Sequence, residues 1–319
     1  MIAALLCACS GRAARSESSA PALTEDRGTF SADSAMLWLK AQTDLGPRVP
    51  GSGAHDACVS YLTGRLRDFG ADTVCVIGGS ARTWEGRSLP VRNIFARYGA
   101  DRPAHILLMA HYDTRPWADR DPEPANREKP IDGANDGASG VAVILEIARN
   151  LGIKGAEVGV DILLTDLEDS GATEEAAAGE DTWCLGAQDF AENLPYSPAD
   201  RPRYGILLDM VGGKDARFHR EYFSDRRASD ATDRVWSMAA RMGLGSRFID
   251  APGGAITDDH LPLIDAGIPV TDIIENMSAA TGSFPATWHT LDDNFGNIDP
   301  QALSDVGRVV LNVIYYEKP

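Results

Sequence analysis

The chain has 319 residues, of which 44% are hydrophobic and 24% charged, so it can build a sizeable core and is not a disordered chain. Its 47 acidic and 30 basic side chains leave a formal net charge of −17, which repels a polyphosphate backbone and argues against nucleic acid as a partner. No apolar run approaches the roughly 20 residues that span a bilayer, which argues against an integral membrane protein.

Residues 1–27 differ in character from the rest of the chain. Within them, Leu6-Cys7-Ala8-Cys9 follows a short apolar stretch and resembles the lipobox at which bacterial lipoprotein signals are cut and acylated on the cysteine. No Lys or Arg precedes that stretch, so a frayed cytoplasmic terminus is the alternative. We expect a periplasmic or outer-membrane lipoprotein whose only membrane contact is a lipid at Cys9, with residues 28–319 forming a single catalytic domain.

The remaining chain alternates between helical and strand-like patterns, without internal repeats. This alternation predicts a single globular α/β domain with a mostly parallel, twisted central sheet and helices on both faces. In chain order, the predicted elements are helices at 31–41 and 57–70, strands at 73–77, 91–98 and 105–110, a helix at 138–151, a strand at 158–165, a helix at 184–194, a strand at 204–210, a helix at 232–242, a strand at 269–274 and a helix at 300–316.

The cysteines of the predicted domain form no CxxC pair and no zinc-finger spacing. We interpret Cys58, Cys75 and Cys184 as buried apolar thiols. In an oxidising compartment Cys58 and Cys75 could pair, and the sequence leaves this open.

Metal-ligand residue types gather where the predicted strands end. A lone Asp in an Asn-Asp-Gly sequence is usually a turn residue, and a lone His at a strand end is usually structural. Several such residues at one edge of a parallel sheet are harder to explain in this way, because ligands bind beyond the carboxyl ends of the strands. Mixed His and carboxylate donors suit Zn²⁺. The residues concerned are His111, Asp113, Asp136, Glu168, Asp169, Asp209 and His289.

Six motifs that carry these residues occur in a fixed order between residues 46 and 300. They are His111-Tyr-Asp113, Gly-Ala-Asn-Asp136-Gly-Ala-Ser-Gly, Glu168-Asp169, Leu-Leu-Asp209-Met-Val-Gly, Asp258-Asp259-His260-Leu-Pro-Leu and Trp288-His289-Thr-Leu-Asp-Asp-Asn. The ordered set resembles the zinc-dependent exopeptidase family and, within it, the animal-type glutaminyl cyclases and their bacterial relatives. The resemblance implies the zinc exopeptidase-like α/β fold.

The resemblance implies two different metal contents. Aminopeptidases of the family bind two zinc ions, through positions matched here by His111, Asp136, Asp169, Asp209 and His289. Glutaminyl cyclases keep equivalent residues but bind one zinc, through the positions of Asp136, Asp169 and His289. Many relatives carry Glu-Glu where this chain has Glu168-Asp169, so the ligand here would be the shorter aspartate. The ligand inventory alone does not decide between one ion and two.

The flanking residues favour the cyclases, because Trp288 directly before His289 and the doubled acid Asp258-Asp259 are similar to that branch. The resemblance therefore implies a glutaminyl-peptide cyclotransferase, an acyltransferase that converts the N-terminal Gln of peptides or proteins to pyroglutamate and releases ammonia. A two-zinc aminopeptidase is the alternative, and a non-catalytic peptide-binding lipoprotein is a second one. We expect a monomer.

The same resemblance suggests a role for each site residue. Glu168 would move the proton, with Asp209 and Asp258 as an acidic pair beside it. The substrate-binding residues would be Trp288, as an apolar wall, and His111. From the sequence itself, the Pro-rich loop 115–131 could lay Trp117 across the pocket as a lid or be a rigid surface excursion, and Trp183 could line the pocket or anchor a helix. Asp113 would orient the His111 imidazole rather than bind metal.

Overall fold

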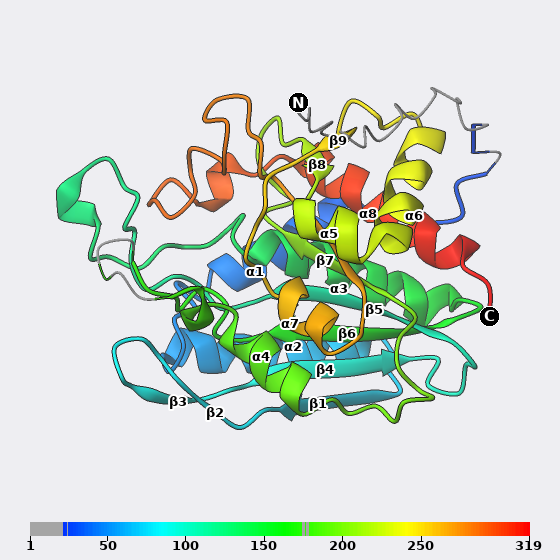
Figure 1. The fold of residues 1–319 in the computed structure, drawn as a ribbon, viewed down its shortest axis with the longest axis horizontal. Coiled ribbons are helices and arrows are strands. Elements are labelled where there is room, and N and C mark those ends of the chain that lie inside the picture. The colour runs from blue at the N-terminus through cyan, green and yellow to red at the C-terminus, as the bar shows by residue number, and fades with distance from the viewer. Residues whose placement is uncertain (1–21, 24, 174–175, 177–178) are drawn as a thin grey trace, which may run out of the picture.

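The computed structural model describes residues 22–23, 25–173, 176 and 179–319 (Figure 1). The lipobox-like sequence and Cys9 lie outside the described residues, so the predicted leader and the boundary at residue 27 stay predictions. Within the described part, no helix is long and apolar enough to cross a bilayer.

A six-stranded sheet in the order β1-β4-β6-β5-β7-β10 forms the centre of the molecule. Its strands are β1 (Thr73–Ile77), β4 (Asn93–Tyr98), β5 (His105–His111), β6 (Gly159–Thr165), β7 (Gly205–Asp209) and β10 (Val270–Ile274). Strands β6, β5, β7 and β10 are parallel, whereas β4 and β1 add an antiparallel edge. The predicted α/β class is confirmed, with a mixed sheet whose parallel half carries the site.

Helices cover both faces of this sheet, as predicted. The larger core contains side chains of α1, α2, α3, α6 and α8, and a second core on the opposite face contains those of α4 and α7. In Figure 1, α4 and α7 lie on the near side of the sheet. The bounds are α1 Ala32–Thr43, α2 Gly53–Asp68, α3 Ala138–Lys154, α4 Leu185–Glu192, α5 Tyr222–Arg227, α6 Ser229–Arg241, α7 His260–Asp265 and α8 Pro300–Tyr316.

Successive side chains of the buried strands point alternately into the two cores. Ile106 and Leu108 of β5 point into the larger core, and Leu107 and Met109 point into the smaller one. Burial on both faces explains why these strands are continuous apolar runs in the sequence.

Several short elements were not predicted from the sequence. They are β2 (Ser80–Arg82), β3 (Ser88–Pro90), β8 (Phe218–Arg220), β9 (Phe248–Pro252), α5, α7 and the 3-10 turns Pro124–Asn126, Glu180–Thr182 and Phe295–Asn297. Most are three to six residues long, which is too short for a hydrophobic period to show. Cys58, Cys75 and Cys184 are all free thiols, so the disulfide left open by the sequence does not form.

Helix α3 packs directly on the parallel half of the sheet and begins at the site. A Cβ on Gly140 would overlap the carbonyl oxygen of Leu208 in β7, so only glycine allows this close approach. The first turn of α3 therefore lies against the carboxyl end of β7, next to Asp209.

Candidate active site

Residues from five separate segments meet at the carboxyl edge of the parallel strands. His111 ends β5 and Asp209 ends β7, while Glu168 and Asp169 follow β6. Two loops complete the set, one carrying Asp136 before α3 and one carrying His289 before α8. The convergence of these side chains is the one that the sequence pattern predicts for an open parallel sheet.

The first group of candidate donors is Asp136, Asp169 and His289, whose ligand atoms lie within 4.8 Å of one another. The Nε2 atom of His289 is 3.2 Å from Asp169 Oδ1 and 3.6 Å from Asp136 Oδ2. Both oxygens of the buried Asp169 carboxylate lack a hydrogen-bond partner among the described residues. Ion pairs with His289 and with Arg115, whose Nη1 is 3.5 Å from Asp169 Oδ1, offset part of the cost of burying this charge, and a bound cation would offset more of it.

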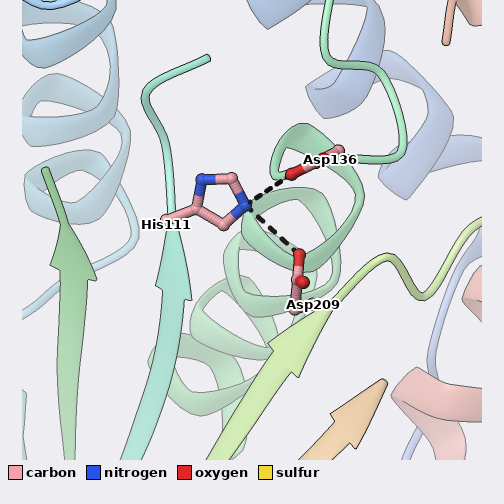
Figure 2. Close-up of side chains that lie close together, drawn as sticks. All are labelled: His111, Asp136 and Asp209. Carbon is pink, nitrogen blue, oxygen red and sulfur yellow. Dashed lines mark hydrogen bonds and ion pairs between the residues drawn. The ribbon is translucent and has the colours of Figure 1, made fainter. Parts of the chain in front are cut away.

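The second group is His111, Asp136 and Asp209 (Figure 2). Its central atom is His111 Nε2, which is 3.0 Å from Asp136 Oδ1 and 3.2 Å from Asp209 Oδ1. A Cβ on Gly137 would overlap the His111 ring, so a glycine is required directly after Asp136. Asp136 belongs to both groups and lies between them.

His111 does not contact the cavity in which a substrate would bind. Its side chain is 1% exposed and is enclosed by Asp113, Asp136, Glu168 and Asp209. The structure therefore places His111 at the buried end of β5, behind the carboxylates that line the cavity, and its role in substrate binding stays a prediction.

Glu168, Cys184 and Asp258 form a third cluster within 4.8 Å, beside the first. The Cys184 thiol donates to Glu168 Oε1 at 3.4 Å, and His111 Nδ1 lies 3.9 Å from Glu168 Oε2. Burial raises the pKa of Glu168 well above its usual range; the charge of His111 opposes this, and that of Asp258 adds to it. A carboxyl whose pKa is raised in this way accepts and donates a proton more readily than a solvent-exposed carboxylate, which stays ionised.

Two further acids share this environment. Burial, with the neighbouring charge of Asp209, raises the pKa of Asp258 to about 7. Burial also raises the pKa of Asp209 to about 6, against the hydrogen bond from His111. The oxygen Oδ1 of Asp258 accepts from the backbone amide of Asp259 at 2.5 Å. The charges of Asp209 and Asp258 therefore repel each other, which favours protonation of one of the two carboxyls.

A cavity of about 490 Å³ opens onto these groups. Its polar wall contains Asp136, Glu168, Asp169, Asp209, Asp258 and His289, and its apolar wall includes Trp183, Phe284 and Trp288. The His289 ring lies between two indoles, with ring centroids 3.9 Å from Trp288 and 6.0 Å from Trp183. Trp183 and Trp288 thus lie where the sequence placed them.

Trp117 is not among the residues that line this cavity. Its ring packs edge-on against Trp84 at a centroid distance of 5.8 Å, with the Arg115 guanidinium 5.5 Å away. The indole of Trp117 thus points toward Trp84 in this structure, as in a surface excursion of the loop, and a role as a lid stays a prediction.

Two buried aspartates hold the donor-bearing loops by their backbones. Asp113 accepts from the amides of Glu168 and Asp169 at 3.1 and 3.3 Å. Asp293 accepts from the amide of Asp136 at 3.1 Å, in the same manner. Asp113 Oδ1 also lies 3.6 Å from His111 Nδ1, so it supports the site rather than joining a donor group.

His289 has a carboxylate behind it that the sequence reasoning missed. Asp119 Oδ1 lies 3.3 Å from His289 Nδ1, and Arg115 binds both Asp119 oxygens at 2.8 Å. Burial opposes ionisation of Asp119, but the hydrogen bonds from Arg115 and His289 prevail and lower its pKa. A carboxylate on Nδ1 leaves Nε2 free to bind a metal, an arrangement typical of metal-bound histidines. No spacing signal marks Asp119, because it lies in the irregular loop after His111.

The backbone is strained at residues that flank this chemistry. Leu167, Met210 and His289 have φ values of 56°, 48° and 55°, in the left-handed region that non-glycine residues avoid. Each lies at or next to a site residue, where such strain concentrates when surrounding contacts fix the conformation.

Comparison with known proteins places this site in a family. Residues 93–314 match the sequence model of peptidase family M28. A glutaminyl-peptide cyclotransferase from Bos taurus is 24% identical over 303 residues, covering 84% of this chain and 79% of the relative.

Solved structures are more similar. A Bacteroides thetaiotaomicron glutaminyl cyclase, bound to N-acetylhistamine, is 46% identical with a TM-score of 0.88, over 91% of this chain and 99% of that one. A leucine aminopeptidase precursor from the same species is 45% identical with a TM-score of 0.86, over 91% and 99%. The neighbours thus bear the names of both activities suggested by the sequence.

Proposed function

Because this chain belongs to peptidase family M28, we propose that it is a glutaminyl-peptide cyclotransferase, an enzyme that cyclises the N-terminal Gln of peptides to pyroglutamate. The observation that carries this proposal is the shared wall of the cavity, where Glu168, Asp258 and Trp288 surround the donor group Asp136, Asp169 and His289. The cyclase names of its structural neighbours support it.

The residues fit the zinc on which the family depends. Two carboxylates and one imidazole are a zinc donor set, and the buried Asp169 oxygens, which accept no hydrogen bond from a described residue, are available as metal ligands. We propose one zinc, held by Asp136, Asp169 and His289, with Asp119 orienting the imidazole. When bound there, zinc supplies Lewis acidity toward the γ-carbonyl oxygen of the substrate.

One ion rather than two agrees with the hydrogen bonds of the second group. The His111 nitrogen that would bind another metal is already within hydrogen-bond distance of Asp136 and Asp209. His111 Nε2 thus has a hydrogen-bond partner inside the second group, whereas in the first group Asp169 Oδ1 is met by ion pairs with His289 and Arg115, at 3.2 and 3.5 Å, and neither Asp169 oxygen accepts a hydrogen bond from a described residue.

The side chains account for the proton movement in the reaction. The α-amine nitrogen of the substrate bonds to its γ-carboxamide carbon, and the bond from that carbon to the amide nitrogen breaks. Glu168 takes a proton from the attacking amine and gives one to the leaving nitrogen, which departs as ammonia, so no water is consumed. Asp209 and Asp258 orient the amide nitrogen beside Glu168.

Trp288 supplies the apolar wall against which the substrate side chain folds. Cyclisation needs the amine close to the carboxamide carbon, and confining the chain to a folded conformation removes much of the entropic cost. Trp288 is fixed for this role by stacking on His289 and by Phe284, whose ring centroid is 4.5 Å away.

A two-zinc aminopeptidase is the second candidate, favoured by the complete set of five donors and by the neighbour named as a leucine aminopeptidase precursor. One assay separates the two. With Gln-Ala-Ala-amide as substrate, a cyclase releases ammonia and leaves a pyroglutamyl tripeptide one ammonia lighter. Release of free Gln with intact Ala-Ala-amide would instead establish the aminopeptidase, and release of neither would refute both.

We also propose that the chain acts in the periplasm or at the outer membrane, anchored through a lipid at Cys9. The lipobox-like sequence at residues 6–9 supports this. Mass spectrometry of the mature N-terminus tests it, and a Cys9→Ser variant that stays membrane-bound would refute it.

A further inference from the structure

A second cavity, of about 500 Å³, adjoins the catalytic one. Both are lined by Trp183, Thr257 and Asp258, so they meet along one wall. The second cavity lies between α4 and α7 and receives no role from the proposed reaction.

The floor of this cavity is apolar. It contains Ala191 at the end of α4, together with Leu261, Pro262 and Ala266 from α7 and its C-terminus. Side chains with an aliphatic stem can cover such a surface while their polar end stays in water.

The rim is acidic. Asp181, Glu192 and Asp265 are exposed around the opening, and the described lining contains no Lys, Arg or His. Asp265 forms an ion pair with Arg227, whereas no ion pair is found for the other two within the described part of the chain. At the junction with the catalytic cavity, Asp258 is 3% exposed, and its Oδ2 lacks a hydrogen-bond partner among the described residues.

The binding mode of the proposed reaction brings the start of the peptide near the second cavity. In that mode the carboxamide lies at the donor group and the α-amine at Glu168, within the same 4.8 Å cluster as Asp258. The α-carbon bears both that amine and the carbonyl that continues the peptide. Asp258 lines both cavities, so a peptide that extends past it enters the second cavity with its next residue.

We propose that the cavity between α4 and α7 binds the residue that follows the N-terminal Gln, and that it selects peptides with Lys or Arg at that position. This inference rests on the proposed function. The aliphatic stem of Lys or Arg covers Leu261 and Pro262, and the charged head lies among Asp181 and Glu192. A Glu or Asp in the same place meets like charges.

The experiment compares Gln-Lys-Ala-amide, Gln-Ala-Ala-amide and Gln-Glu-Ala-amide by kcat/KM, at ionic strengths of about 0.02 M and about 0.5 M. It uses the full-length zinc enzyme and the double variant Asp181→Asn/Glu192→Gln. The matched control is Asp33→Asn/Asp230→Asn, which removes the same charge from exposed positions on α1 and α6. Calorimetric titration with pyroglutamyl-Lys-Ala-amide and pyroglutamyl-Glu-Ala-amide measures the same preference without turnover.

We expect the wild type to favour Lys over Glu by about tenfold at low salt, and the double variant by less than about threefold. The control variant keeps the wild-type ratio and the wild-type turnover of Gln-Ala-Ala-amide, and high salt reduces the wild-type ratio. An unchanged ratio in the double variant, or no preference in the wild type, overturns the inference while leaving the cyclase assignment standing. If no Gln peptide is cyclised, the proposed function fails, and the calorimetric titrations still decide whether the cavity between α4 and α7 binds the Lys peptide more tightly than the Glu peptide.

Discussion

Asp293 fixes Asp136 through the backbone: its Oδ2 accepts the Asp136 amide at 3.1 Å, while its Oδ1 accepts the preceding amide at 2.7 Å. Asp136, which belongs to both groups of candidate donors, is thus held by Asp293, a residue more than 150 positions later in the chain.

Replacing Asp293 with Asn places an amide donor against one of these backbone N–H groups. We expect zinc affinity to fall by about 10- to 100-fold, as for other supports of metal ligands, with the fold retained. Competition with a chromogenic chelator measures the affinity. Asp292→Asn is the control. Equal zinc affinities in the two variants would mean that the hydrogen bonds from Asp293 to the backbone do not hold Asp136 in place.

The adjacent residues Glu168 and Asp169 should separate chemistry from metal binding. Glu168→Gln should lower kcat by about 10²- to 10⁴-fold, because its amide cannot move the proton. It should retain bound zinc, whereas Asp169→Asn should lose it. Assays of pyroglutamate formation and elemental analysis of both variants test this, and a fully active Glu168→Gln enzyme would refute the mechanism.

Removal of zinc should lower both activity and thermal stability. Without the cation, Asp136, Asp169 and Asp209 repel one another in a buried site. Dialysis against a chelator followed by stepwise zinc addition should restore activity at about one equivalent per chain. Recovery only at two equivalents would instead favour the aminopeptidase.

The buried thiols should resist alkylation in the native state. Burial raises the pKa of Cys58 to about 12 and that of Cys184 well above its usual range. Burial also raises the pKa of Cys75, but this thiol is only half-buried and so is open to reagents. Because the thiolate is the reactive form, iodoacetamide at pH 8 should label Cys75 first. Peptide mapping by mass spectrometry identifies the sites, and early labelling of Cys58 would be inconsistent with this core.

Glu275 should make stability depend on pH. Burial raises its pKa to about 7, against a hydrogen bond with Ser278 and the charge of Arg247. A raised folded-state pKa stabilises the protein fully below the unfolded value of about 4.5, and this contribution is lost as pH rises through about 7. Relative to Glu275→Gln, the wild type should therefore lose at most about 3 kcal/mol between pH 4.5 and pH 8.

Urea unfolding at both pH values measures that difference. Glu128→Gln, at an exposed position, provides the control and should change stability equally at each pH. A Glu275→Gln difference that does not vary with pH would mean that this carboxyl ionises normally in the folded protein.

Much of the site could be predicted because it follows the strands. His111, Asp169 and Asp209 lie at or after the ends of long apolar runs, so the parallel sheet itself brings them together. Their motifs also pointed to the partners Asp136 and His289, although both come from loops. The predicted roles of these residues await the mutants above.

The supporting contacts could not be predicted in the same way. Asp119 and Asp293 reach the site through irregular loops, whose course depends on tertiary packing rather than on a local period. The orientation of the Trp117 indole toward Trp84 could not be predicted for the same reason. The antiparallel orientation of β4 could not be predicted either, because an apolar run does not show whether its strand pairs parallel or antiparallel with its neighbour.

Asp136 offers one oxygen toward each donor group. Two divalent ions on either side of a single carboxylate would repel each other, so occupancy of one position weakens the other. Binding of a second ion would then be anticooperative with binding of the first, so the number of ions bound would depend on the free zinc concentration as well as on the amino-acid sequence. An assay run in large metal excess would sample a different species from one run at stoichiometry.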